Sequence, residues 1–304
     1  MLKKIIKYLV NEKTRISFNS KMGFYKYISD RMYLEKFFKI HMGYDLNLED
    51  PQTFNEKLQW LKLYDRKPEY TIMVDKYKVR DYISDKIGKE YLIPLLGVWD
   101  DPDDIDFDSL PNKFVLKCNH DSGGLSICRN KETFNVNMAK KKLKKSLKTN
   151  YYYFGREWPY KNVPRKIICE KYMTDETGEN LKDYKFYCFD GIPKLVGVYQ
   201  DRNSDKETTG DFFDMNFEWV GLKFGMPNAK IKPQKPNKFE EMIQIAKTLS
   251  EGIPHVRVDL YLSNDKIYFG ELTFFDGSGF DRIEPIDWDY KLGSRIKLPK
   301  IKKY

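Results

Sequence analysis

Asp259 and Glu271, near the C-terminus, are placed where two carboxylates can hold a metal ion together. Residues 256–262 and 267–274 both alternate apolar with other side chains, which predicts two β-strands, and residues 263–266 between them have turn chemistry. The apolar side chains define the buried face, so both carboxylates point to the other face, about 5–8 Å apart in the simplest register. Two close, uncompensated carboxylates repel each other. The pair therefore predicts a hard cation with oxygen ligands, most simply Mg²⁺ shared with phosphates.

A plainer interpretation of the same hairpin needs no metal. Asp259 lies beside Arg257, and Lys266 lies in the turn, so the two acids also fit a solvated sheet face on which basic neighbours balance their charge. Both interpretations predict the hairpin, and they differ in what its polar face binds.

A glycine loop in the middle of the chain has the chemistry of an anion site. Ser122, Gly123 and Gly124 lie between two strand-like stretches, and glycine lets backbone N–H groups approach an anion because it has no Cβ. Lys117 lies near the end of the preceding strand, where its ammonium can reach the same phosphates. The loop fits neither the Walker pattern Gly-x4-Gly-Lys-Ser/Thr nor the dinucleotide pattern Gly-x-Gly-x-x-Gly. On its own it also fits an ordinary turn, with Lys117 protecting an edge strand.

Composition favours a folded protein with an anionic partner. The 304 residues include 22 Tyr and 20 Phe, which is enough for a large core. The formal net charge of +9 predicts a nucleotide, a nucleic acid, an anionic lipid or an acidic polysaccharide as partner. The 4 cysteines form no Cys-x-x-Cys pair and lie in apolar stretches, which indicates buried thiols rather than disulfides or a zinc site.

No membrane-spanning helix is predicted, because no apolar run approaches the about 18–20 residues that a span requires. Residues 1–10 are amphipathic instead, with apolar side chains on one helical face and lysines on the other. This pattern fits a helix on an anionic membrane surface and equally a terminal helix docked on the protein's own core.

The elements that must position these residues give a helical first part, a compact middle and a β-rich remainder, which we expect to be residues 1–110, 111–175 and 176–304. The predicted elements are a helix opened by the capping box Thr53–Glu56, a helix over 68–86 ending at Gly88, a short buried strand over 94–99, strands over 113–118 and 125–128, a helix over 137–148, a strand over 166–172, a hairpin over 184–190 and 194–200 closed by Asp190-Gly191, a helix begun at Asn237, the hairpin described above, and a basic tail over 295–304.

In their order these stretches resemble the ATP-grasp fold, in which the nucleotide lies between two α+β units. The closer resemblance is to the teichuronopeptide-biosynthesis-type (TupA-like) ATP-grasp family of bacterial surface-polysaccharide loci, over residues 54–280. It implies an α+β fold with a helical N-terminal region, a small lid subdomain and a larger β-rich C-terminal subdomain. The stretches that carry it are FNEKLQW (54–60), DKYKVR (75–80), FVLKCNHDSGG (114–124), EKY (170–172), DYKF (183–186) and GELTF (270–274).

The resemblance also implies a role for each candidate residue. Lys117 contacts the α- and β-phosphates of ATP, the glycine loop closes over them, and Arg257 steadies the γ-phosphate or an acyl phosphate. Thr273 stands where most ATP-grasp ligases have Asn, so one strong oxygen ligand is missing and the usual two-ion site is in question. The remaining implied contacts are His120 in the loop, Glu170, Lys171 and Tyr172 at the adenine edge, Asp183 at the ribose, Lys185 at the phosphates, Arg202 and Arg257 at an acidic substrate, and Asp259, Glu271 and Thr273 at Mg²⁺.

Structural alternatives stay open for several of these residues. Each alternative assigns the side chain to local packing or to an ion pair instead of a ligand. They are an ion pair of Glu170 with Lys166 or Lys171, a same-face pair of Asp183 with Lys185, a turn role for His120, a loop salt bridge for Arg202, and a solvated helix face for the lysines of residues 140–148.

The function that the resemblance implies is an ATP- and Mg²⁺-dependent ligase that joins a carboxylate to an amine through an acyl phosphate. The expected carboxylate belongs to an acidic sugar or a sugar-linked group in cell-surface polysaccharide synthesis, and the expected amine is an amino acid or amino alcohol. The expected location is the cytoplasm, including the inner face of the cell membrane.

Three other functions remain open from the sequence. A sugar kinase uses the same nucleotide site, and a glycosyltransferase of the same pathway binds a sugar nucleotide without a glycine lid. A nucleic-acid-binding module is favoured by the charge of +9 and by interleaved Lys and Tyr residues, but the chain shows no recognised nucleic-acid motif, and we expect no nucleic-acid partner.

Overall fold

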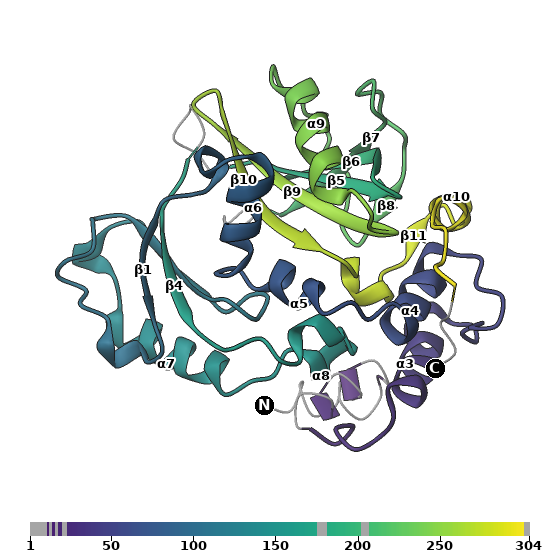
Figure 1. Ribbon diagram of the computed structural model, residues 1–304, viewed down its shortest axis with the longest axis horizontal. Helices are drawn as coiled ribbons and strands as arrows, with labels where there is room; N and C mark the ends of the chain where they lie inside the picture. Colours follow the sequence, from purple (N-terminus) through teal and green to yellow (C-terminus); the bar gives the residue numbers. More distant parts are fainter. Residues whose placement is uncertain are drawn as a thin grey trace.

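The structure is a computed structural model that describes residues 11, 14–15, 18–19, 23–174, 181–201 and 207–300. Within these residues it contains helices and strands that carry the labels of Figure 1. In chain order they are α3 (Asp30–Met42), α4 (Phe54–Tyr64), α5 (Glu69–Val74), α6 (Val79–Ile87), η1 (Lys89–Tyr91), β1 (Leu95–Trp99), η2 (Pro102–Asp104), β2 (Phe114–Cys118), β3 (Leu125–Cys128), η3 (Lys131–Thr133), α7 (Val136–Leu147), α8 (Tyr152–Gly155), η4 (Trp158–Tyr160), β4 (Ile167–Lys171), β5 (Asp183–Phe189), β6 (Ile192–Gln200), β7 (Thr209–Phe213), β8 (Lys223–Phe224), α9 (Phe239–Ser250), β9 (His255–Ser263), β10 (Lys266–Thr273), η5 (Asp276–Gly279), β11 (Ile283–Glu284) and α10 (Asp287–Arg295).

Two antiparallel sheets form the frame of the molecule. One has the strand order β1-β4-β2-β3 and the other β10-β9-β5-β6-β7, while β11 and β8 pair separately. Figure 1 shows the four-stranded sheet on the left and the five-stranded sheet at the upper right. Helices α5 and α6 lie between them, and Arg80 of α6 reaches Glu170 of β4. A ligand held between the sheets therefore meets side chains from both.

Side chains alternate along strand β2 between a buried face and a more exposed face of the smaller sheet. Phe114, Leu116 and Cys118 are buried and pack with Leu143 of α7 in one apolar cluster. Lys117 lies between them in sequence, so it points to the opposite face. Because β2 pairs with both β3 and β4, Lys117 lies on an interior strand rather than at an edge.

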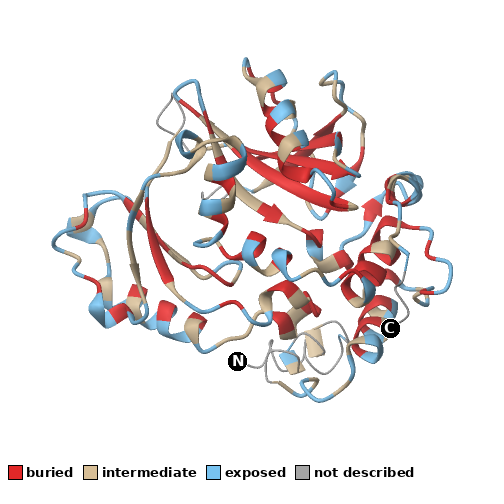
Figure 2. Ribbon diagram, viewed as in Figure 1, coloured by how far each residue is buried: buried red, intermediate tan, exposed pale blue. Residues whose placement is uncertain are grey.

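Strands β5 and β9 of the larger sheet are buried on both faces along most of their length, as Figure 2 shows. Helix α9 covers one face with apolar residues such as Phe239, Met242 and Leu249. The other face of β9 carries Arg257 and Asp259, which are also buried. Charged residues on a buried face require partners, so this face must contain compensating groups.

The sequence predicts most of these elements, with two corrections. The two hairpins and the capping box of α4 are confirmed, and Asp190 and Gly191 turn with φ values of 52° and 76°. The predicted helix over 68–86 is wrong, because it breaks into α5 and α6 where the carboxylate of Asp75 accepts hydrogen bonds from the backbone N–H groups of Tyr77 and Lys78. Asn237 does not cap α9, since its side chain bonds Asp265.

Other differences arise at the edges of the fold. Strand β1 is half-buried rather than buried because it is an edge strand. Helix α10 and strand β7 were not predicted, and α10 ends at Arg295, the first residue of the predicted basic tail. The four cysteines are buried free thiols, as predicted. The boundaries at residues 110 and 175 stay predictions, although β1 precedes the first boundary and pairs with β4 beyond it.

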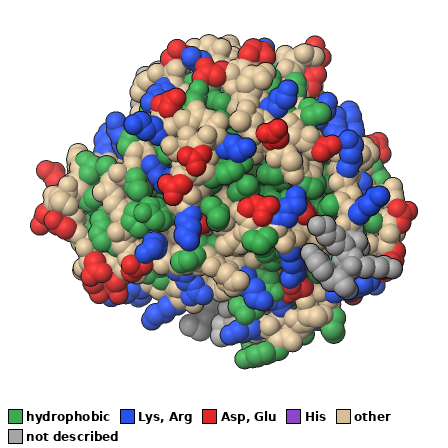
Figure 3. Space-filling view, in the orientation of Figure 1, with side chains coloured by type: hydrophobic (Ala, Val, Ile, Leu, Met, Phe, Trp, Pro, Cys, Tyr) green, Lys and Arg blue, Asp and Glu red, His purple; other side chains and the backbone are tan. Residues whose placement is uncertain are grey.

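The surface and the ends of the chain complete the description. Basic and acidic side chains are interspersed over the face seen in Figure 3. In the part of the chain that the structure describes, every helix is too short or too polar to cross a bilayer. The amphipathic segment 1–10 and Arg202 lie outside the described residues.

Candidate functional site

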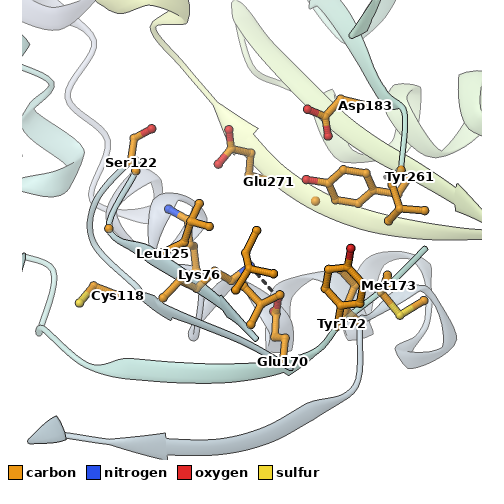
Figure 4. Close-up of a pocket in the computed structure, with 18 of the residues that line it drawn as sticks. Lys76, Cys118, Ser122, Leu125, Glu170, Tyr172, Met173, Asp183, Tyr261 and Glu271 are labelled. Atoms are coloured by element: carbon orange, nitrogen blue, oxygen red, sulfur yellow. Dashed lines mark ion pairs between the residues drawn. The ribbon is translucent and has the colours of Figure 1, made fainter. Parts of the chain in front are cut away.

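A cavity of about 220 Å³ lies between the two sheets. Figure 4 shows Ser122 and Leu125 of the glycine-loop side facing Glu271, Asp183 and Tyr261 of the larger sheet across it. The sheets thus bring together residues that are far apart in sequence, such as Lys117 and Glu271, which are 154 positions apart. The predicted residues that line the cavity are Lys117, Ser122, Gly123, Gly124, Glu170, Lys171, Tyr172, Asp183 and Glu271.

Lys117 and Glu170 form an ion pair inside this cavity. The two residues lie on neighbouring strands, and Lys117 Nζ is 2.6 Å from Glu170 Oε2. Arg80 Nη1 contacts the other carboxylate oxygen at 3.5 Å. Glu170 therefore has partners other than the Lys166 or Lys171 that the sequence offered, and its two cations place positive charge on the cavity wall.

The glycine loop leaves backbone open to the cavity. Gly123 has a φ of 87°, which favours glycine, and a Cβ there would meet no atom within 4 Å. Below the loop, Lys76 Nζ donates a 2.6 Å hydrogen bond to the carbonyl of Asp121. The Tyr151 side chain hydrogen-bonds Ser122. The loop is thus anchored at the two residues that precede its glycines, while Gly123 remains exposed.

The floor of the cavity is apolar and aromatic. Val115, Ile127, Met173 and Leu181 line it together with Tyr172. Figure 4 shows the rings of Tyr172 and Tyr261 on opposite sides of the space. A flat aromatic ligand group fits between such walls, while the lysines and the glycine loop lie toward the other end.

Asp259 and Glu271 are direct cross-strand partners on the polar face, as the sequence predicts. A bulge between Phe269 and Glu271 creates this pairing, because Phe269 pairs with Leu260 and one extra residue then precedes Glu271. Phe269 and Leu272 are both buried on the core side. The bulge thus keeps the core pattern and turns Glu271 to the polar face.

Arg257 is the centre of that polar face. Its Nη2 lies 2.8 Å from Asp259 Oδ2, 3.2 Å from Glu271 Oε1 and 3.1 Å from Thr273 Oγ1. Burial alone would lower the pKa of Arg257, but Asp259 and Asp276 outweigh burial and hold that pKa well above its usual value. The predicted metal ligands Asp259, Glu271 and Thr273 therefore each direct one oxygen toward Nη2 of Arg257.

Asp259 is not the uncompensated acid that the sequence predicted. Besides Arg257, it accepts a hydrogen bond from the ammonium of Lys185. Burial still raises its pKa above the usual value, because desolvation outweighs both cations. The described residues contain no cluster of three or more His, Cys, Asp or Glu side chains able to hold a metal. Any ion here must use the two carboxylates, Thr273 and ligand oxygens.

Several predicted residues lie outside the cavity lining. Lys185, Arg257 and Asp259 are buried directly behind Glu271, and the half-buried Thr273 contacts it. Lys185 also lies 3.7 Å from Asp183, which is the same-face pair left open by the sequence. His120 is buried behind the loop, and its Nε2 lies 3.2–3.3 Å from the carbonyls of Ser146 and Thr149. The structure therefore places His120 apart from the cavity.

Lys76, Tyr261 and Asp276 are among the residues of the site that were not predicted. Lys76 and Tyr261 line the cavity, and Asp276 accepts a hydrogen bond from Arg257. The period-two alternation of strand residues could have identified Tyr261, because it follows Arg257 and Asp259 on the same strand face. Lys76 lies in the stretch DKYKVR, but no pattern in the sequence assigns it to the loop.

Comparison with known proteins gives one extensive match. A family model described as TupA-like ATP-grasp matches residues 56–297. This match confirms the resemblance and the predicted fold class. No curated protein sequence is similar enough to match.

Solved structures are more distant. A D-alanine–D-alanine ligase from Bacillus anthracis is 18% identical, with 67% of this chain and 57% of that chain covered and a TM-score of 0.38. An L-amino acid ligase from Bacillus licheniformis is 13% identical, with coverages of 83% and 56% and a TM-score of 0.44. The chain thus spans under two thirds of both proteins. Likeness at this level says nothing about substrate, and the family assignment rests on the family model.

Proposed function

Because the chain belongs to the TupA-like ATP-grasp family, we propose that it is an ATP- and Mg²⁺-dependent ligase that joins a carboxylate to an amine. The observation that carries the proposal is the cavity itself. It combines an accessible glycine loop and Lys117 from one sheet with Glu271 from the other, next to an aromatic floor. This is the combination that a bound nucleotide triphosphate requires.

The distribution of apolar and basic residues over the cavity favours one orientation of the nucleotide. Its base occupies the apolar floor beside Tyr172, and its ribose lies toward Asp183. Its phosphates lie under Gly123 and Gly124, next to Lys117. The pair of Lys117 with Glu170 keeps the ammonium in place, so that phosphate binding needs only a small movement of the side chain.

The donor set on β9 and β10 fits Mg²⁺. Oxygens of all three ligands are of the hard kind that Mg²⁺ prefers. Nη2 of Arg257 lies where oxygens of Asp259, Glu271 and Thr273 converge, so an ion would bind beside the guanidinium, on the side where Glu271 lines the cavity. These three residues would hold the ion, with phosphate oxygens completing its coordination. Bound there, Mg²⁺ would neutralise phosphate charge.

The proposed reaction has two steps. The substrate carboxylate attacks the γ-phosphorus of ATP, the bond to the β,γ-bridging oxygen breaks, and an acyl phosphate and ADP form. The amine then attacks the acyl carbon, the C–O bond to phosphate breaks, and the amide, inorganic phosphate and a proton are released. Lys117 and Arg257 stabilise the negative charge that moves between these groups, and no nucleophilic side chain is needed.

The substrates are proposed from the family and from the charge of the chain. The carboxylate belongs to an acidic sugar or a sugar-linked group in cell-surface polysaccharide synthesis, and the amine is an amino acid or amino alcohol. A net charge of +9 supports a polyanionic substrate. The same charge and the amphipathic sequence of residues 1–10 support work at the inner face of the cell membrane.

Thermal unfolding with and without ATP and Mg²⁺ tests the nucleotide site. A ligand at about 100-fold its Kd stabilises the folded state by about 2.7 kcal/mol, so the melting temperature must rise. Lys117→Ala and Glu271→Ala should lose this rise. Lys113→Ala and Glu284→Ala, at exposed positions, should keep it. A wild-type protein without any rise would contradict the proposal.

Product analysis then separates a ligase from a sugar kinase. A ligase releases ADP in stoichiometric amounts only when both a carboxylate and an amine are supplied. A kinase releases ADP with a sugar alone, and that result would replace the proposed reaction with phosphoryl transfer to a hydroxyl.

A further inference from the structure

One face of helix α4 is polar and buried, and the proposed reaction so far gives it no part. Asn55, Gln59 and Lys62 each have 0% of their surface exposed. Their spacing of four and three residues puts them on one side of the helix. The capping box of α4 uses Thr53 and Glu56 instead, so helix formation does not explain these three side chains. Buried polar groups that serve no local purpose call for a distant partner.

That partner is the backbone of the loop that follows strand β10. Gln59 Nε2 donates to the carbonyls of Ser278 at 3.1 Å and Gly279 at 2.7 Å. Lys62 Nζ donates to the carbonyl of Ser278 at 2.7 Å, and Asn55 Nδ2 donates to that of Asp281 at 3.1 Å. These bonds join residues 216 to 226 positions apart. Side chains of helix α4 thus bind main-chain carbonyls of the loop.

Lys62 suits this task because an ammonium has three donors. Besides Ser278, its Nζ donates to the carbonyl of Gly155 at 2.7 Å and to Gln59 Oε1 at 2.9 Å. One side chain therefore joins α4, the end of α8 and the loop. Gln59 also packs closely against the loop, because a Cβ on Gly279 would lie 2.3 Å from Gln59 Nε2.

The loop needs such support because of its backbone. Gly277, Ser278 and Gly279 have φ values of 54°, 53° and 62°, three left-handed residues in succession. For Ser278 this conformation is unfavourable, and it persists only where surrounding contacts determine it. The hydrogen bonds from Gln59 and Lys62 to Ser278 and Gly279 are such contacts.

The loop in turn holds Arg257. Its first residue, Asp276, accepts hydrogen bonds from Arg257 Nη1 and from the Tyr187 hydroxyl. The same guanidinium contacts Asp259 and Glu271 through its other nitrogens. A continuous path of direct contacts therefore runs from α4 through the loop to Arg257, to which the proposed reaction gives a role in stabilising the transferred phosphoryl group.

We propose that Gln59 and Lys62 are positioning residues, which fix the loop so that Asp276 aims Arg257 at the γ-phosphoryl group. This inference rests on the proposed function, and it assigns a purpose to the stretch FNEKLQWLK (54–62) that the cavity leaves unexplained. Neither residue lines the cavity, so both act through Asp276 and Arg257.

Lys62→Met tests the proposal, with Lys57→Met as its matched control. Lys57 lies on the same helix and also donates to a carbonyl, that of Ile296 at 2.9 Å, but it does not touch the loop. Calorimetric titrations measure the affinities for Mg²⁺·ADP and for Mg²⁺ with the ATP analogue AMP-PNP. Only AMP-PNP has a γ-phosphoryl group, so Lys62→Met should weaken AMP-PNP about tenfold, as for one charge-assisted hydrogen bond, and leave ADP unchanged. Lys57→Met should keep both affinities.

Hydrogen exchange of the backbone amides in residues 276–280 gives an independent measurement without nucleotide. Lys62→Met should speed their exchange, and Lys57→Met should not. Equal affinity ratios and equal exchange in the two variants would overturn the positioning role. A wild-type protein that binds neither nucleotide would contradict the proposed function instead, while exchange still decides the loop contact. Gln59→Met carries the same test if Lys62→Met does not fold.

Discussion

Glu271 is the direct cross-strand partner of Asp259 because strand β10 bulges at Gly270. A Cβ on Gly270 would lie 2.9 Å from the Tyr261 ring and 3.0 Å from the carbonyl oxygen of Asp259. The bulge therefore fits only a residue without a side chain, and the pairing of the two carboxylates depends on it.

Gly270→Ala should lower the free energy of unfolding by about 1–3 kcal/mol, as for overpacking of a filled site. The contact with the Tyr261 ring causes part of this loss, so the substitution should cost less in a Tyr261→Ala background. Denaturant unfolding of the two single variants and the double variant measures the difference. Equal costs in both backgrounds would show that the ring does not set the bulge.

Glu170→Gln should destabilise the protein by about 1–3 kcal/mol, because it leaves the charges of Lys117 and Arg80 next to each other without their shared carboxylate. Lys117→Met, added to Glu170→Gln, removes one of these charges and should recover part of the loss. Denaturant unfolding at low and high salt checks both effects, since salt screens the repulsion. A double variant less stable than Glu170→Gln would contradict the ion-pair account.

Thr273→Asn should strengthen binding of Mg²⁺ in the presence of ADP, because an amide oxygen is a better ligand for a hard cation than a hydroxyl. Thr273→Val should weaken it, since the hydroxyl oxygen is lost from the converging set. Mn²⁺ titration followed by electron paramagnetic resonance compares the three proteins. The same Mn²⁺ affinity in all three would remove Thr273 from the ligands.

His255 should make stability depend on pH. Its ring is fully buried among Phe54, Tyr187 and Phe189, and burial lowers its pKa to about 4 from 6.5. A folded pKa below the unfolded one means that stability is lost as pH falls from 6.5 toward 4, by up to about 3 kcal/mol. Unfolding measured at several pH values should show a flatter decline for His255→Gln. Parallel curves would place the titration elsewhere.

The sequence predicted the parts of the site that follow a local pattern. Alternation along β9 and β10 located Asp259 and Glu271 on one face, and the glycine loop marked the end of the cavity where we propose that the phosphates bind. Such patterns could not predict that both faces of β5 and β9 are buried, because a period of two residues assigns only one face of a strand to the core. The prediction that Asp259 is uncompensated was therefore wrong, because Lys185 approaches it from the neighbouring strand β5.

Long-range contacts account for most of what the sequence did not predict. The break between α5 and α6 depends partly on Asn119, whose side chain donates a 2.8 Å hydrogen bond to Asp75. The hydrogen bonds from α4 to the loop after β10 join segments more than 200 residues apart, as in the bond of Lys62 to Ser278 with a separation of 216. The spacing of residues within either segment does not predict such a contact.

Calorimetric titration of Mg²⁺·ADP into the wild-type chain and into Lys117→Met tests most directly whether the cavity between the sheets is a nucleotide site. We predict one ADP per chain for the wild type, an affinity at least about tenfold weaker for Lys117→Met, and an unchanged affinity for Lys113→Met. Wild-type protein that takes up no heat of ADP binding, or a Lys117→Met variant that binds as tightly as the wild type, would contradict the account.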